Sequence, residues 1–145
     1  ICIMSNFHSF SPNTISGSTG YYPTINLVSN DALTELDIII KDSSTAASGQ
    51  TLDAADSTTW APINLSAAST VVTMKMRKLN DTTIITSTIC TIVQPYTDGH
   101  VIMSWGVSGL SGLAGDYEGE IEVAYATGKI LTVQDLLKFN IREDF

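Results

Sequence analysis

The sequence predicts an all-β domain in which short strands pack as a sandwich of two sheets. Apolar and polar residues alternate with a two-residue period in several segments, which is the pattern of a half-buried strand. Turn-forming residues separate these segments at short, regular intervals, and no long segment has the 3.6-residue period of a helix. With 145 residues, of which 43% are hydrophobic and 15% charged, the chain fits a single domain with one core.

The first thirty residues differ from the rest because they contain no Asp, Glu, Lys or Arg. Aromatic residues are spread through this segment, which is otherwise rich in Ser, Asn, Thr and Gly: Phe7, Phe10, Tyr21 and Tyr22. We expect residues 1–31 to form an extended arm that lies along another protein and is ordered by it. The four aromatics are its predicted partner-binding anchors, since buried aromatic side chains carry much of an interface's energy. A flexible terminus is the alternative.

Charged residues begin at Asp31, and the sandwich is expected to occupy residues 32–145. Its first strand is predicted at residues 36–41, where Leu, Ile and Ile alternate with Asp, Ile and Lys. Residues 42–59 are small, polar and aperiodic, which favours a long surface loop or a loosely paired edge. The next strand, at residues 71–77, places its apolar residues on one face: Val72, Met74 and Met76.

Two further strands are predicted on either side of a Pro-Tyr-Thr-Asp-Gly turn at residues 95–99. Residues 82–93 are dense in Ile and Thr on both faces, as in a strand that is covered on both sides or bent by a bulge. The Asp-Gly pair favours a tight hairpin into residues 100–105. On that strand, one face is apolar: Val101, Met103 and Trp105.

After a glycine-punctuated crossing at residues 106–115, the clearest alternation in the chain spans residues 117–125. Its polar face is predicted to form an exposed acidic ridge near Lys75 and Arg77, and consists of Glu118, Glu120 and Glu122. Residues 126–129 then turn the chain into residues 130–133, and a last strand spans residues 137–142. Six or seven short strands at this spacing predict an immunoglobulin-like β-sandwich.

Composition excludes several classes of partner. Seven Lys and Arg residues against fifteen Asp and Glu give a formal net charge of −8, the wrong sign for binding phosphates, so no nucleic acid is expected. No apolar stretch is long enough to span a bilayer, so we expect a soluble protein without a membrane partner. Cys2 and Cys90 lie far apart without a CxxC motif, which predicts no metal site and a buried Cys90.

No catalytic constellation stands out, so the prediction is a protein that is not an enzyme and has no cofactor. The only histidines, His8 and His100, have no Asp or Cys at a spacing that suggests a triad or a metal site. Asp53 and Asp56 supply too few oxygens for calcium. A paired-carboxylate catalyst on the glutamate strand is the alternative.

The C-terminal half carries several motifs in succession. A hydrophobic strand ends in Trp at residues 98–105, an Ala-Gly-x-Tyr corner and an acidic alternating strand follow at residues 114–123, and a Gly-Lys hairpin spans residues 125–130. Together they resemble the N-terminal domain of phage baseplate upper proteins and related phage immunoglobulin-like modules. The resemblance implies a tyrosine corner at Tyr117. Gly119 stands where antibody domains have their second cysteine, so no inter-sheet disulfide is expected.

The resemblance implies a virion building block, assembled in the host cytoplasm. Because the sequence ends at Phe145 with the last strand, we expect a capsid decoration (cement) protein that binds and stabilises the shell. Its partner would be the major capsid protein or another virion protein, and it would form a homo-oligomer. The alternative is a tail, baseplate or fibre adaptor with a host- or glycan-binding role, in which Trp60 and the preceding loop form a ligand platform.

Overall fold

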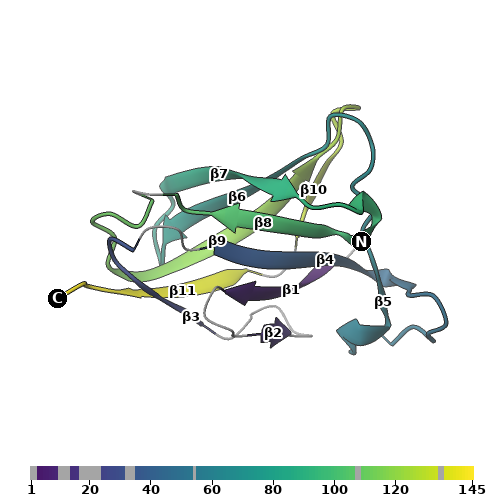
Figure 1. Ribbon diagram of the computed structural model, residues 1–145, viewed down its shortest axis with the longest axis horizontal. Coiled ribbons are helices and arrows are strands. Elements are labelled where there is room, and N and C mark those ends of the chain that lie inside the picture. The colour runs from purple at the N-terminus through teal and green to yellow at the C-terminus, as the bar shows by residue number, and fades with distance from the viewer. Residues whose placement is uncertain are drawn as a thin grey trace.

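A computed structural model describes residues 3–9, 14–16, 24–31, 35–53, 55–106, 109–133 and 136–145, and it confirms the all-β class (Figure 1). Two short 3-10 helices, Ser57–Thr59 and Tyr96–Asp98, lie in connections between strands. The strands are β1 Ile3–Ser9, β2 Thr14–Ser16, β3 Ile25–Val28, β4 Glu35–Ala46, β5 Trp60–Pro62, β6 Val71–Lys78, β7 Ile84–Ile92, β8 His100–Ser104, β9 Gly115–Ala124, β10 Ile130–Thr132 and β11 Leu137–Arg142.

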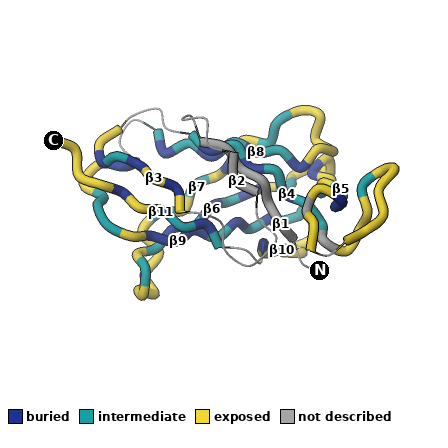
Figure 2. The backbone as a smooth tube through the Cα atoms, turned by 90° about the horizontal axis from the view of Figure 1, so that it is seen from below, coloured by how far each residue is buried: buried dark blue, intermediate teal, exposed yellow. Residues whose placement is uncertain are grey.

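The strands form one curled, mixed sheet in the order β2-β1-β4-β8-β7-β6-β9-β11-β3. All neighbours pair antiparallel except β3, which runs parallel to β11, while β5 pairs with β4 and β10 with β9. The curled sheet encloses one apolar core along its inner face, and buried and exposed positions alternate along the strands (Figure 2). The core side chains that are fully buried on the central strands include Leu36, Ile38, Met74, Met76, Met103 and Ile121.

The alternation predicted for the central strands is confirmed. On β6 the even-numbered residues from Val72 to Met76 are fully buried, while Thr73, Lys75 and Arg77 face outward and are partly exposed. The two-residue period puts every second side chain on the inner face, and burial of that apolar face drives the sheet to curl around the core. Strands β4, β8, β9 and β11 follow the same pattern.

Parts of the predicted arm belong to the sheet. Strand β1 pairs with β4 along its whole length, and β3 pairs with β11 over all four of its residues. Ile25 and Leu27 of β3 are buried in the core. Removing residues 1–30 would therefore take away a core strand as well as any arm, because burying two such side chains contributes several kcal/mol.

The corner before β9 is built as the tyrosine motif predicts. The hydroxyl of Tyr117 donates a hydrogen bond to the carbonyl oxygen of Ala114, 3.2 Å away, and the Tyr117 ring is buried. Two residues later, a Cβ on Gly119 would lie 2.9 Å from Cε2 of Phe139 and 3.0 Å from Sδ of Met74. Only glycine at position 119 lets these two side chains pack over the strand. The thiol of Cys90 is free and buried.

The turn between β7 and β8 differs in detail from the predicted tight hairpin. The chain makes a 3-10 turn at Tyr96–Asp98, and Gly99 follows in the left-handed region with a φ of 64°. A Cβ on Gly99 would collide with the carbonyl oxygen of Ile40, so glycine is required both by conformation and by space. Beyond the turn, β8 pairs with β7 only at Val101 and Ile102, while its other edge pairs with β4 from His100 to Ser104.

Candidate interaction surface

The predicted arm anchors are placed only in part. Phe7 lies in β1, where it is the register partner of Ile38 on β4. Phe10, Tyr21 and Tyr22 lie outside the described residues. The role of these aromatics in binding another protein therefore remains a prediction.

Trp60 cannot serve as the ligand platform considered above. Its side chain is 3% exposed and belongs to the core, and its indole N–H donates to the carbonyl oxygen of Asp53 at 2.8 Å. Thr59 also closes the loop, because its backbone oxygen accepts a hydrogen bond from the amide of Ala47. The platform prediction is wrong because an indole that fills the core has no free face for a sugar to stack on.

The structure brings together one polar pair that the sequence spacing did not reveal. Nε2 of His100 on β8 lies 3.1 Å from Oδ1 of Asp37 on the neighbouring strand β4, and both side chains are partly exposed. His8 is the register partner of Asp37 on the other side, in β1. A nucleophilic triad needs a hydroxyl or thiol hydrogen-bonded to the histidine, and none of the described residues supplies one. The pair is a surface contact between adjacent strands.

Among the residues whose positions are described, no group of three or more His, Cys, Asp or Glu side chains could hold a metal ion. Nor does that part of the chain contain a helix long and apolar enough to cross a bilayer.

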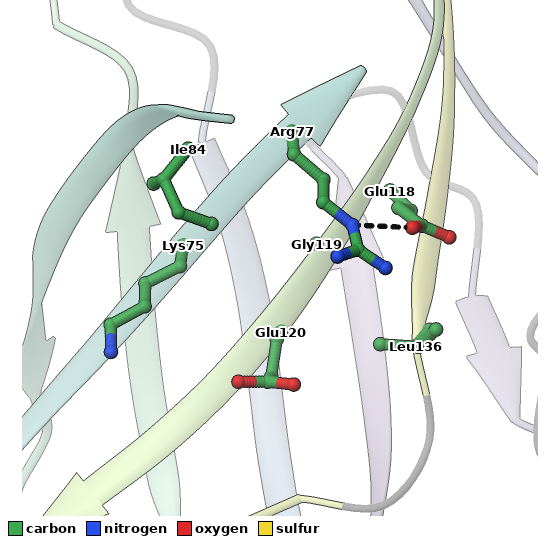
Figure 3. Close-up of a pocket in the computed structure, with 7 residues that line it drawn as sticks. All are labelled: Lys75, Arg77, Ile84, Glu118, Gly119, Glu120 and Leu136. Carbon is green, nitrogen blue, oxygen red and sulfur yellow. Dashed lines mark hydrogen bonds and ion pairs between the residues drawn. The ribbon is translucent and has the colours of Figure 1, made fainter. Parts of the chain in front are cut away.

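The outer face of β6 and β9 is a ladder of opposite charges, as the sequence predicts. Nζ of Lys75 lies 3.0 Å from Oε2 of Glu122, and Nε of Arg77 lies 2.6 Å from Oε1 of Glu118. The prediction of an exposed acidic ridge is wrong for Glu118, whose side chain is only 9% exposed where it pairs with Arg77. A hollow of about 110 Å³ lies on this face. Figure 3 shows Lys75, Arg77 and Glu118 among the side chains that line it, together with Ile84 of β7. Since both cations are paired, the hollow has no unpaired cation for an anionic ligand.

Strand β7 carries an uncovered apolar surface next to this ladder. Three of its isoleucines are among the most exposed large apolar side chains described: Ile84 at 49%, Ile85 at 43% and Ile89 at 72%. Ile84 and Ile89 point to the outer face. Their register partners on β6 are Arg77 and Thr73, which face outward, and paired residues lie on the same face of a sheet. The register shifts between Met76 and Arg77, so β7 has one extra residue there. This is a β-bulge, one of the two interpretations that the sequence of residues 82–93 left open.

The same strand also has an unpaired backbone edge. On one side β7 pairs with β6 from Ile84 to Cys90, whereas on the other side it pairs with β8 only at Thr91 and Ile92. Within the described part of the chain, nothing pairs with that second edge between Ile84 and Cys90. In Figure 1 the strand runs along the upper margin of the molecule. An edge of this length presents a row of N–H and C=O groups to a partner.

Comparison with known proteins gives the chain no family. No protein-family model matches the sequence, and no curated protein matches it. Among solved structures, the soluble domain of PmoD from Methylocystis sp. (strain Rockwell) aligns over 96% of this chain and 90% of its own, with 9% sequence identity and a TM-score of 0.43. A similarity at that level carries no argument about function.

Proposed function

We propose that this protein is a phage virion structural protein that binds and stabilises the capsid shell as a decoration protein, with no catalytic role. The observation that carries the proposal is the corner at Tyr117. It lies in the stretch whose motifs resemble phage immunoglobulin-like modules, and its hydrogen bond to Ala114 is the contact that this family pattern implies. On this proposal the curled sheet is a variant of the immunoglobulin-like sandwich.

The surface chemistry supports attachment to a protein. The ladder on the outer face of β6 and β9 is internally paired, and the adjacent β7 exposes isoleucines. Exposed apolar side chains beside unpaired backbone groups suit a protein partner, since both gain from being covered by another chain. Repetition around the symmetry axes of a shell would multiply one modest contact into firm attachment.

The test is the copy number of this chain in purified particles of the phage that encodes it, measured by quantitative mass spectrometry against the major shell protein. We expect a ratio close to that of the shell lattice. A ratio matching the few symmetric positions of a tail would instead place the protein in the baseplate, and absence from the particles would overturn the virion proposal.

The arm is tested separately by replacing Phe10, Tyr21 and Tyr22 with serine in the full chain. This variant is preferable to removal of residues 1–30, because β3 contributes Ile25 and Leu27 to the core. We expect a folded protein whose occupancy on particles falls. Unchanged occupancy would mean that the aromatics are not anchors.

A further inference from the structure

We propose that two copies of this protein pair through the free edge of β7, antiparallel and about a two-fold axis at Ser87. The partner is thus a second copy of the chain, and the two curled sheets become one continuous sheet across the dimer. The inference rests on the edge and its sequence. It does not depend on the proposed virion role.

The five residues of β7 around the proposed axis form a palindrome. Residues 85–89 read Ile-Thr-Ser-Thr-Ile. When two identical strands pair antiparallel with Ser87 opposite Ser87 of the second copy, Ile85 falls opposite Ile89 and Thr86 opposite Thr88. Directly opposed β-branched and Thr pairs are among the cross-strand contacts that stabilise sheets. The arrangement sets two of the three exposed isoleucines of each copy, Ile85 and Ile89, opposite those of the other.

Charge also favours a second copy. Strand β7 contains no charged residue, although the chain carries a net charge of −8. A two-fold axis brings identical residues together, so any charge at its centre would face its own copy and repel it. The nearest cation in the row through Ser87 is Lys75, its register partner on β6. Three strand spacings would separate Lys75 from its counterpart, roughly 14 Å, which exceeds the screening length at physiological salt.

The edge lacks two of the features that keep natural edge strands apart, since it has no Lys and no Pro from Ile84 to Cys90. Its one bulge lies at Ile85, at the end of the proposed pairing and not at its centre. Strand β8 pairs with β7 only through Val101 and Ile102, whereas its other edge pairs with β4 from His100 to Ser104. Because a two-fold pairing uses this edge in both copies, it stops at two subunits.

The first test is the oligomeric state of the purified full chain by sedimentation equilibrium over a range of micromolar concentrations. We expect a monomer–dimer equilibrium. The Ser87→Lys variant should raise the dimer dissociation constant at least about tenfold, because it opposes two like charges at the axis. Thr132→Lys, which adds the same charge at an exposed position on β10, is the matched control and should leave the dissociation constant unchanged. Circular dichroism establishes that both variants fold.

The second test determines the register in which the two copies of β7 pair. A Ser87→Cys variant should form a disulfide-linked dimer under mild oxidation, because opposed residues in an antiparallel pair have Cα atoms about 4.5–5.5 Å apart, within disulfide range. Ile85→Cys should not link to itself, since its two copies would lie roughly 13 Å apart, but should link to Ile89→Cys when the two variants are mixed. These variants are made in a Cys2→Ser background, and burial raises the pKa of the remaining native thiol, Cys90, to about 12, so it does not compete.

Four results would overturn the proposal. They are a chain that stays monomeric throughout, a dimer that Ser87→Lys leaves intact, an open-ended assembly, or disulfides that form equally well at Thr132→Cys.

Discussion

Strands β6 and β7 are neighbours of similar length, yet only one of them is covered. Strand β6 lies between β7 and β9, and its inner side chains at positions 72, 74 and 76 are fully buried. Strand β7 pairs with β6 from Ile84 to Cys90 and with β8 only at Thr91 and Ile92, and it exposes three isoleucines. The difference teaches that a strand's hydrophobicity does not decide its burial. Its place in the sheet does, and an apolar strand left at an edge is a surface for association.

The sharpest way to break this comparison is to remove a side chain from the covered strand. Met74→Ala should lower the free energy of unfolding by about 2–5 kcal/mol, because the side chain is fully buried and its loss leaves a cavity. Thr73→Ala, on the outer face of the same strand, is the matched control and should change it by less than about 0.5 kcal/mol. Urea denaturation measures both. Equal effects would mean that the inner face of β6 is not the core.

Overpacking the same region gives the next largest effect. Gly119→Ala should cost about 1–3 kcal/mol, because the new methyl group would press on Phe139 and Met74. Combining it with Met74→Ala removes one of the two clashes, so the double variant should lose less stability than the sum of the single changes. Simple additivity in denaturant titrations would contradict the packing described around Gly119.

The buried end of β7 should make stability depend on alkaline pH. Burial raises the pKa of the Cys90 thiol from its ordinary value of 9.0 to about 12. As pH rises above 9.0, the unfolded chain releases this proton while the folded chain keeps it, so folding loses stability, by roughly 1 kcal/mol near pH 10. The Cys90→Ala variant should show a shallower decline between pH 8 and pH 10.5. Parallel profiles for the two proteins would show that Cys90 does not contribute.

The exposed part of β7 should give the smallest change in folding. Ile89→Thr should alter the free energy of unfolding of the monomer by less than about 0.5 kcal/mol, because a 72% exposed side chain loses little contact. The measurement is made at concentrations well below the dimer dissociation constant. A loss comparable to that of Met74→Ala would remove the distinction between the two strands.

Much of the strand pattern was readable from the sequence. The period of two on β4, β6, β8 and β9 predicted which residues face the core, and the Tyr117 motif predicted its hydrogen bond. Register was not readable, because it depends on which strands become neighbours. Asp37 and His100 are far apart in sequence, and only the pairing of β4 with β8 brings them within 3.1 Å. The outward-facing isoleucines on β7 were likewise ambiguous, since Ile and Thr on both faces also describe a strand covered on both sides.

The sequence by itself determined the all-β class, the inner faces of the strands and the absence of charge on β7, because alternation and composition are local properties. Only the tertiary structure decided that β3 enters the core, that Trp60 is buried, and that β8 leaves β7 after two paired residues. Those outcomes depend on which distant segments pack against the same apolar core. The free energy of burying that core depends on all of these segments together, so no single segment determines it.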